Sequence, residues 1–301
     1  MKDISTLVPD MNDVLRGMGG WDAAATHFLS EGIAGLAAKR FSEKQEPRNH
    51  LSPSMMGKPC DRQKWYMVNK PNSGETLSAE TLGTFFYGDI LEIFAIALAK
   101  AAGHTITGLQ EPLDICGIRG SGDVVIDGWV VDVKSASSYG FEKFKGNQLK
   151  GFHKTTKKDG RVWVPPEEAD GFGYISQLSS YLYGYRNNPE VHHKDRAAFL
   201  AVKKDRFKLH LDFYNLEKEV ENKPEEVKRN QAMVKGDIPP RGFTDTEDGK
   251  SGNRKLKFQC SYCSYKKDCW PNLRAFSYSD GPRYLTQVVR QPADTVKEIP
   301  V

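Results

Sequence analysis

The chain has 301 residues, with 39% hydrophobic residues, a mean hydropathy of −0.57 and a formal net charge of +4. This composition is typical of a soluble globular chain with one large domain or two small ones. Because the sequence has neither a run of about 18 uncharged apolar residues nor the apolar start of a secretory signal, we expect a cytoplasmic protein. Five unevenly spaced cysteines are too few for a disulfide framework, and the mild basic charge permits a polyanionic partner without requiring one.

The N-terminal part of the chain is expected to be helical. Residues 11–42 carry apolar positions at helical spacing, interrupted by Gly19-Gly20 and by Gly32, and this pattern predicts two short helices. A charged, proline-containing connector over 39–53 then leads to the segment around Cys60. Residues 82–102 are apolar on nearly every side and precede a glycine, which predicts a buried helix.

In the rest of the chain the spacing of apolar residues is no longer helical throughout. Residues 111–134 predict β-strands separated by glycines. Residues 141–163 are rich in lysine and glycine, which predicts a mobile cationic segment. The other expected elements are a helix with Gln177 and Tyr181, a hairpin (197–203 and 206–213), an exposed helix (216–235) and a polar loop (244–257).

These elements predict an α/β (α+β) fold with a central mixed sheet flanked by helices. The expected organisation is a helical N-terminal segment (1–53), a main domain (54–274) and a C-terminal tail (275–301).

The stretch from Asp123 to Lys134 carries the most informative pattern. If Asp127-Gly128 is the two-residue hairpin turn that this dipeptide favours, Asp123 and Asp132 face each other across the two strands. Directly opposed residues have Cβ atoms about 4.5–5.5 Å apart, and like charges at that separation destabilise a sheet. A divalent cation between them would turn this repulsion into a binding site, and oxygen-only ligands favour Mg²⁺ or Mn²⁺.

Lys134 projects from the same strand face as Asp132, because side chains alternate along a strand. Two acids and an amine on one patch suit phosphodiester hydrolysis: the metal polarises the phosphoryl oxygen and acidifies a bound water, and the lysine orients that water or offsets charge in the transition state. The alternative is a hairpin whose acids face solvent. Valines and an isoleucine occupy both faces of the expected hairpin, which counts against this alternative.

The residues Asp123 and Asp132-Val133-Lys134 resemble the PD-(D/E)XK core of restriction-endonuclease-like enzymes, although Gly122 stands where the motif's name places proline. The resemblance implies a restriction-endonuclease-like core and a Mg²⁺- or Mn²⁺-dependent DNA nuclease. The activity that it implies is exonucleolytic, in recombination, repair or phage replication.

Two further elements match the RecB-type exonuclease branch of these nucleases. Gln177 and Tyr181 have the spacing of its QxxxY element, and they share one helix face from which they can contact a DNA backbone or the catalytic lysine. Gly88 and Glu92 resemble the Gly-x3-Glu form found in relatives of phage lambda exonuclease, and this resemblance implies Glu92 as a candidate third metal ligand. The alternatives are a core position for Tyr181 and a solvated helix face shared by Glu92 and Asp89.

Cys260, Cys263 and Cys269 have the C-x2-C-x5-C spacing of metal ligands. Cys60, in a polar context, is the favoured fourth ligand, since Cys116 lies in an apolar run where a small buried cysteine is the ordinary interpretation. One distant cysteine followed by this spacing resembles the iron–sulfur nucleases of the same branch, including AddB and the CRISPR-adaptation nucleases. That resemblance implies a structural [4Fe-4S] cluster, while the spacing alone leaves Zn²⁺ open.

DNA, as ends or single strands, is the expected partner, with a recombination protein or helicase as a second one. Basic residues in 143–161 and 203–208 can neutralise phosphates without reading sequence, although most charge runs are solvated faces. The rival functions are a noncatalytic DNA-binding or scaffold subunit and a structure-specific endonuclease on the same fold. Aromatic side chains that can stack on unpaired bases interleave the first patch: Phe141, Phe144, Phe152 and Trp163.

Overall fold

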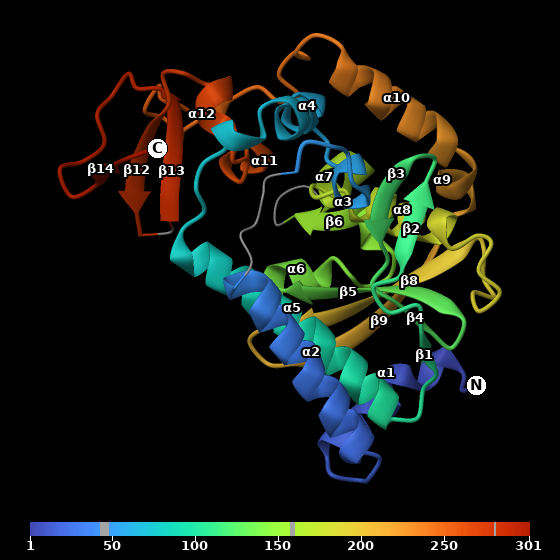
Figure 1. Ribbon diagram of the computed structural model, residues 1–301. Helices are drawn as coiled ribbons and strands as arrows, with labels where there is room; N and C mark the ends of the chain where they lie inside the picture. The colour runs from blue at the N-terminus through green and yellow to red at the C-terminus, as the bar shows by residue number, and fades with distance from the viewer. Residues whose placement is uncertain (43–47, 157–159, 280) are drawn as a thin grey trace. The chain divides into compact units, whose positions relative to one another are not determined.

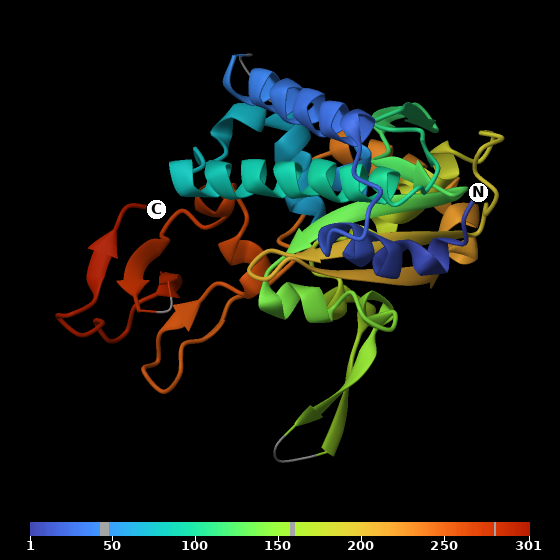
Figure 2. The same ribbon diagram turned by 90° about the horizontal axis from the view of Figure 1, so that it is seen from below.

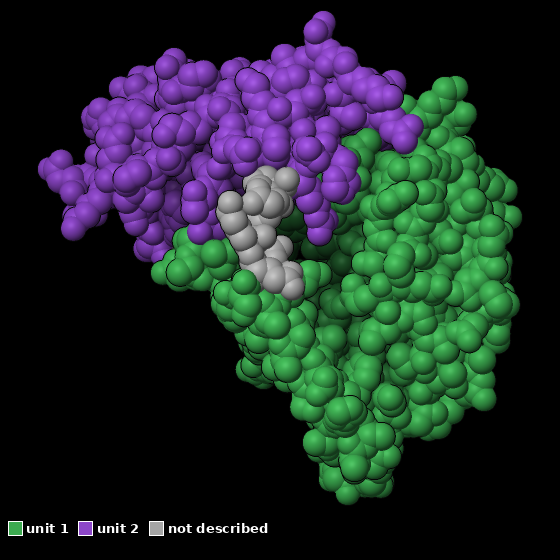
Figure 3. All heavy atoms as spheres, in the orientation of Figure 1, with its two compact units in different colours: residues 1–46, 51–57, 78–229 green, residues 47–50, 58–77, 230–301 purple. Residues whose placement is uncertain are grey.

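The computed structural model describes residues 1–42, 48–156, 160–279 and 281–301. The chain forms two compact units, coloured separately in Figure 3. Unit 1 comprises Met1–Glu46, Leu51–Gly57 and Ser78–Arg229, and unit 2 comprises Pro47–His50, Lys58–Leu77 and Asn230–Val301. The expected main domain over 54–274 is therefore divided: the predicted acids and lysine belong to unit 1, and four of the five cysteines belong to unit 2.

A five-stranded mixed sheet forms the centre of unit 1, in the order β1-β4-β5-β8-β9 (Figure 1). Its strands are β1 (Ile106–Thr107), β4 (Val124–Ile126), β5 (Trp129–Ala136), β8 (Arg196–Lys203) and β9 (Lys208–Asn215). The pairing of β5 with β8 is parallel and the other pairings are antiparallel. The expected mixed sheet with flanking helices is confirmed, and so is the β8–β9 hairpin.

Three helices form layers over one face of this sheet: α1 (Leu7–Leu15), α2 (Ala23–Phe41) and α5 (Ala79–Ala101). Figure 2 shows α2 lying over α5 and α5 over the sheet. Residues of α1, α5 and the strands form one buried core, which includes Leu7, Met11, Leu91, Ile96, Leu98, Val131, Val133 and Leu200.

The two helices predicted over 11–42 are confirmed as α1 and α2, with the interruption at Gly19-Gly20 between them. The interruption expected at Gly32 is wrong, since α2 runs through this residue. A Cβ atom at position 32 would lie 2.6 Å from Ile93 Cγ2. Glycine is therefore required where α2 packs closely against α5, and it does not end the helix. The connector expected over 39–53 is shorter than predicted, because α2 continues to Phe41 and α3 begins at Pro53 (Pro53–Met56); residues 43–47 lie outside the described part.

Within the described residues, α5 alone is long and apolar enough to cross a membrane by length and composition. Ser78 caps its first turn by accepting a hydrogen bond from the Thr81 N–H group. Its second half, from Ala95 to Leu98 and beyond, is buried in the core of unit 1. The predicted burial is therefore confirmed for the second half only, since Leu82, Phe85 and Tyr87 in the first half are exposed.

The opposite face of the sheet contacts α6 (Ser138–Glu142) and α8 (Tyr174–Gly184). The segment 141–163, expected to be mobile, instead contains the end of α6, a 3₁₀ turn η3 (Gln148–Lys150) and most of a hairpin of β6 (Phe152–Thr156) and β7 (Gly160–Val164). Its apolar residues Phe141, Phe144 and Leu149 are buried, which anchors the segment despite its many lysines. Lys157 and Lys158 of the predicted cationic segment lie outside the described residues.

The remaining elements of unit 1 are short, except for α10, which continues into unit 2. They are η1 (Ile4–Thr6), a hairpin of β2 (Pro112–Ile115) and β3 (Ile118–Ser121), α7 (Pro166–Ala169), α9 (Glu217–Glu221) and α10 (Lys223–Lys235). The exposed helix expected over 216–235 is thus two helices that break at Asn222.

Unit 2 is built on a five-stranded antiparallel sheet in the order β10-β11-β13-β12-β14. The strands are β10 (Thr246–Glu247), β11 (Arg254–Lys255), β12 (Arg274–Tyr278), β13 (Gly281–Gln287) and β14 (Lys297–Ile299), and the helical elements are α4 (Asp61–Asn69), η2 (Pro71–Ser73), α11 (Phe258–Ser261) and α12 (Lys266–Cys269). The predicted tail after Ala275 is therefore wrong, since strands β13 and β14 lie there. The predicted polar loop over 244–257 is confirmed except for the two short strands β10 and β11. These strands are short, and few of their side chains are buried, so the periodic signal that marks a strand is weak.

Candidate active site and thiol cluster

The hairpin of β4 and β5 has the predicted register, with Val124 opposite Val131 and Val125 opposite Val130. The turn residues Asp127 and Gly128 have positive φ angles of 46° and 80°, as a type I′ turn requires. The Asp127 side chain bonds to His104 Nδ1 at 2.5 Å and accepts a 3.0 Å hydrogen bond from the Thr105 N–H group. These bonds fix the hairpin turn to the segment that leaves α5.

This register places Asp123, the residue before β4, across from Asp132. The two carboxyl groups are close enough to interact electrostatically. Asp123 also accepts a 3.2 Å hydrogen bond from the Val133 N–H group. Burial, and next the charge of Asp132, hold the pKa of Asp123 well above its ordinary value. Without a cation, this pair of carboxyls is therefore electrostatically unfavourable in its doubly ionised form.

Lys134 is the cation of this group. Its Nζ atom donates to Asp132 Oδ1 at 2.7 Å. Burial lowers the pKa of Lys134, but the nearby carboxylates of Asp132 and Asp123 outweigh burial and raise it. Lys134 is thus a fixed positive charge at neutral pH and not a base. The second oxygen, Asp132 Oδ2, is buried and has no hydrogen-bond partner among the described residues.

Glu92 approaches the same acids from α5. Burial raises the pKa of Glu92 to about 7, and the charge of Asp132 adds to the shift. Gly88, one turn earlier, lets the helix approach β5, because a Cβ atom there would lie 2.9 Å from Ser135 Oγ. Asp89 instead pairs with Arg40 at 3.8 Å and has a side chain that is 46% exposed. The structure therefore brings Glu92 toward the buried acids and leaves Asp89 on the outer side of the helix.

Replacing Glu92 with glutamine is expected to stabilise the metal-free protein near pH 8 and to change little near pH 4.5. The folded-state pKa of about 7 lies above the ordinary value of 4.5, so the folded state binds the proton more tightly. Stability is highest below about pH 4.5 and falls as pH rises through about 7. Thermal unfolding in the presence of a chelator would measure the change in stability at each pH, with Glu190→Gln at an exposed position as control. Equal changes in stability at pH 8 and pH 4.5 would contradict the raised pKa of Glu92.

Helix α8 contributes Gln177 and Tyr181. The helix starts where the Asp170 carboxylate accepts 2.8 Å hydrogen bonds from the N–H groups of Tyr174 and Ile175. Gln177 Nε2 donates to the Tyr181 hydroxyl at 2.7 Å. Tyr181 is buried, as the core alternative expected. Burial and the nearby charge of Asp132 both raise its pKa, so the hydroxyl stays neutral beside the acids.

Gln110 also belongs to this site, and no sequence pattern pointed to it. Its Nε2 donates to Glu92 Oε1 at 3.2 Å, and its backbone N–H donates to the Asp123 carbonyl at 3.0 Å. Ser121 Oγ donates to Gln110 Oε1 at 3.3 Å. The φ angle of Gln110 is 49°, which is uncommon for a residue other than glycine. Such a constraint in a loop has no periodicity, so only the structure reveals it.

The departure of Gly122 from the motif's proline has a structural cause. A Cβ atom at position 122 would lie 2.5 Å from Cε2 of the Tyr185 ring. The Gly122 N–H group donates to the Glu111 carbonyl at 3.3 Å, a hydrogen bond that proline cannot make. Tyr185, which also donates to the Gly108 carbonyl at 2.7 Å, thus fills the space beside the strand.

Four cysteines line one cavity in unit 2: Cys60, Cys260, Cys263 and Cys269. Burial raises the pKa of Cys260 to about 12 and that of Cys263 to about 11, and the neighbouring thiols add to both shifts. The thiols are thus close enough to interact electrostatically. The remaining lining residues are Arg62, Gln63, Tyr66, Phe243, Gln259, Tyr265, Lys266 and Trp270.

Cys116 does not belong to this cluster, since it lies in unit 1 at the β2–β3 turn. The expectation that it is a small buried cysteine is wrong: it is exposed, its φ angle is 52°, and its Sγ atom lies 3.2 Å from the Tyr183 hydroxyl. Across 1–42, 48–156, 160–279 and 281–301, no group of three or more histidine, cysteine or acidic side chains has an arrangement that could already hold a metal ion.

Comparisons with known proteins leave the site to be judged on its own residues. No family model matches the chain, and no curated protein matches it. Among solved structures, the crystal structure of SSO0001 is similar to this chain at a TM-score of 0.40 and 12% identity, over 81% of this chain and 95% of the other. A TM-score this low carries no argument about fold family or activity.

Proposed function

We propose that this protein is a metal-dependent DNA exonuclease of the PD-(D/E)XK type, with a restriction-endonuclease-like core and a cytoplasmic location. The observation that carries the proposal is the buried Asp132 carboxylate, which has one oxygen on Lys134 and the other without a partner among the described residues, beside a second buried carboxyl. A buried polar atom without a partner is costly, and a bound ion is one of its ordinary explanations.

The donor set fits a hard divalent cation. Asp123, Asp132 and Glu92 offer only carboxylate oxygens, which suit Mg²⁺ or Mn²⁺. Three carboxylates and the Lys134 ammonium together carry two negative charges, which one divalent ion balances. When bound, such an ion polarises a phosphoryl oxygen and makes a coordinated water more acidic.

The remaining chemistry belongs to the side chains. Lys134 cannot accept a proton while its pKa is raised, so its role is to hold the attacking water or to offset negative charge on the phosphate. The neutral Tyr181 hydroxyl, bonded to Gln177, can donate to a backbone phosphate oxygen. Attack of water on phosphorus then forms a new P–O bond and breaks another in the DNA backbone, and the attacking water gives up a proton. The leaving oxygen takes up a proton.

For the thiol cavity of unit 2 we propose a structural [4Fe-4S] cluster, with Zn²⁺ as the alternative. Four thiols around one cavity satisfy the donor set of either cofactor. Lys58 and Lys266 both interact electrostatically with Cys263, which suits a site where thiolates carry the charge. The cluster would join the segment around α4 to α11 and α12, and no electron transfer is required of it.

The direct test is digestion of end-labelled linear DNA and closed circular DNA with Mg²⁺ or Mn²⁺. We expect loss of linear DNA only, abolished by Lys134→Ala and unchanged by Lys218→Ala, a substitution on the exposed helix α9. Cleavage of circular single strands or branched DNA would favour a structure-specific endonuclease. Tight binding without cleavage of any substrate would favour a noncatalytic DNA-binding subunit.

Replacing Gln110 with methionine is expected to weaken Mn²⁺ binding by about 10–100-fold, as is typical when a group that orients a metal ligand is removed. Methionine keeps the length of the side chain but cannot donate to Glu92. Titration calorimetry would measure the affinity, with Gln148→Met in η3 as control. Unchanged affinity in the Gln110 variant would show that its hydrogen bond does not position Glu92.

A further inference from the structure

The hairpin of β6 and β7 is exposed on both faces. Among the described strands its two members pair only with each other, and Figure 2 shows the hairpin projecting from unit 1. His153 to Thr155 and Gly160 to Trp163 are exposed on both faces of the hairpin. A two-stranded ribbon without a covering layer is only marginally stable in water. The protein therefore maintains this ribbon without the burial that stabilises its other strands.

Trp163 on this hairpin is exposed but held in place. Its side chain is 50% exposed. Gly151 makes room for the ring, since a Cβ atom there would lie 2.5 Å from Trp163 Cζ2. The imidazole of His153, the cross-strand partner of Trp163, lies 5.0 Å away between ring centroids. The indole thus rests on a glycine backbone and a neighbouring ring while half of its surface stays open.

The positive charge of the hairpin favours a negatively charged partner. Arg161 is paired with Thr155, and alternation along the strands puts Arg161 on the same face as Trp163 and His153. By sequence, 151–164 contains three lysines and one arginine against a single aspartate. A flat aromatic ring beside cations is the combination that single-stranded nucleic acids use, because bases stack on the ring and phosphates meet the cations.

We propose that the hairpin face with His153, Arg161 and Trp163 binds unpaired DNA bases, with Trp163 as the stacking platform and Arg161 on the adjoining phosphate. This inference rests on the proposed nuclease function and names its preferred form of substrate, a single strand or a frayed end. Phe141 and Phe144, which the sequence suggested for the same role, are buried and belong to the core.

The test is a binding measurement without divalent ions, so that no cleavage occurs. Fluorescence anisotropy would compare a labelled oligothymidine with a duplex of the same length. We expect Trp163→Ala to weaken single-strand binding by roughly 10-fold and to leave duplex binding unchanged. We expect oligothymidine to quench the tryptophan fluorescence of the intact protein. Trp163→Phe should retain most of the affinity but lose this quenching.

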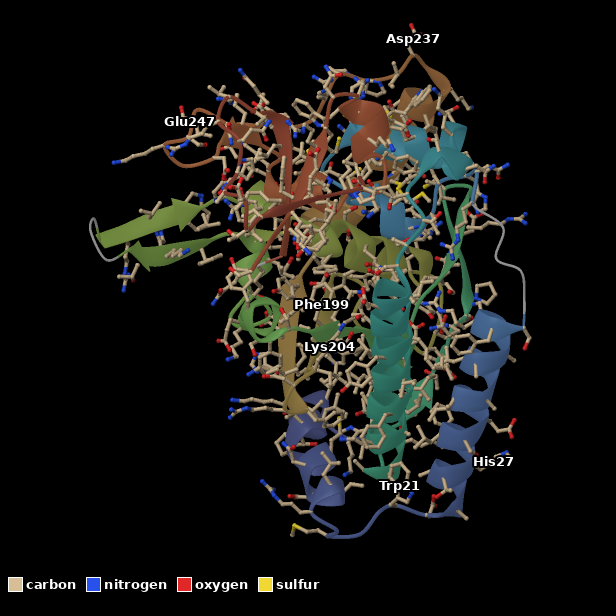
Figure 4. All side chains as sticks on the ribbon, turned by 90° about the vertical axis from the view of Figure 1, so that its left-hand side faces the viewer. Trp21, His27, Phe199, Lys204, Asp237 and Glu247 are labelled. Atoms are coloured by element: carbon tan, nitrogen blue, oxygen red, sulfur yellow. The ribbon has the colours of Figure 1, made fainter. Side chains whose placement is uncertain are left out.

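Trp21→Ala is the matched control, because Trp21 is also partly exposed and lies near the start of α2, apart from the hairpin (Figure 4). The proposal would be overturned if Trp163→Ala bound the single strand as tightly as the intact protein does. It would also be overturned if Trp163→Ala lost as much affinity for duplex DNA as for the single strand. Failure of the nuclease function would appear separately, as absence of metal-dependent cleavage by the intact protein.

Discussion

Replacing Asp123 with asparagine is expected to abolish metal-dependent cleavage and, at the same time, to stabilise the metal-free protein. Asparagine keeps the shape of the side chain and can still accept from the Val133 N–H group, but it removes one of two buried carboxyls. The raised pKa of Asp123 means that the folded state favours its protonated form. Stability is therefore highest below the unfolded pKa of about 3.9 and is lost as pH rises toward the folded pKa.

The expected gain at neutral pH is about 1–3 kcal/mol in the free energy of unfolding, and the expected loss of cleavage is about 10³-fold or more. Denaturant unfolding with a chelator measures the first, and digestion of linear DNA with Mn²⁺ the second. A gain of stability with loss of cleavage distinguishes a functional carboxylate from a structural one, because removal of a structural group lowers both.

Asp132→Asn is the matched control, with an opposite expected effect on stability. Asp132 is the partner of Lys134, and its removal leaves a buried ammonium without its closest counter-charge. We expect this variant to lose cleavage and also stability. If Asp123→Asn instead destabilised the metal-free protein as Asp132→Asn does, the two carboxyls would not repel each other, and the argument for a cation between them would fail.

The sequence predicted the parts of this site that depend on local rules. The Asp127-Gly128 dipeptide specifies a tight turn, and a tight turn fixes which residues face each other, so the pairing around Asp123 and Asp132 followed from two residues. The i and i+4 spacing of Gln177 and Tyr181 is a property of any helix. In both cases the relevant distance along the chain is short, and backbone geometry alone determines the outcome.

The parts that sequence reasoning missed depend on contacts between distant segments. Gln110 reaches Glu92 because a loop has a left-handed backbone at that residue, and Tyr185 occupies the space beside Gly122 because α8 ends there. Gly32 has the residue type of a helix break, but its role is to let α2 pack against Ile93. Each of these roles is set by a partner residue far along the chain, and without that partner the residue type has several ordinary explanations.

Replacing Cys263 with serine is expected to remove the bound iron, bleach the visible absorbance and destabilise unit 2. Burial and neighbouring thiols raise the pKa of Cys263 to about 11 and that of Cys260 to about 12, so the metal-free thiols are protonated at neutral pH. Binding of a cofactor therefore releases protons and supplies folding free energy to the segments that carry the ligands.

The expected loss in unit 2 is about 4 kcal/mol or more, which is the stabilisation by a ligand present at about 1,000 times its dissociation constant. Iron analysis, the visible spectrum and thermal unfolding measure the three effects, and Cys116→Ser, at an exposed cysteine of unit 1, is the control. If the intact protein were colourless and contained zinc but no iron, the cofactor would be Zn²⁺ and the four-cysteine site would still be correct. A Cys263→Ser variant with full metal content and unchanged unfolding would remove the cluster from the proposal.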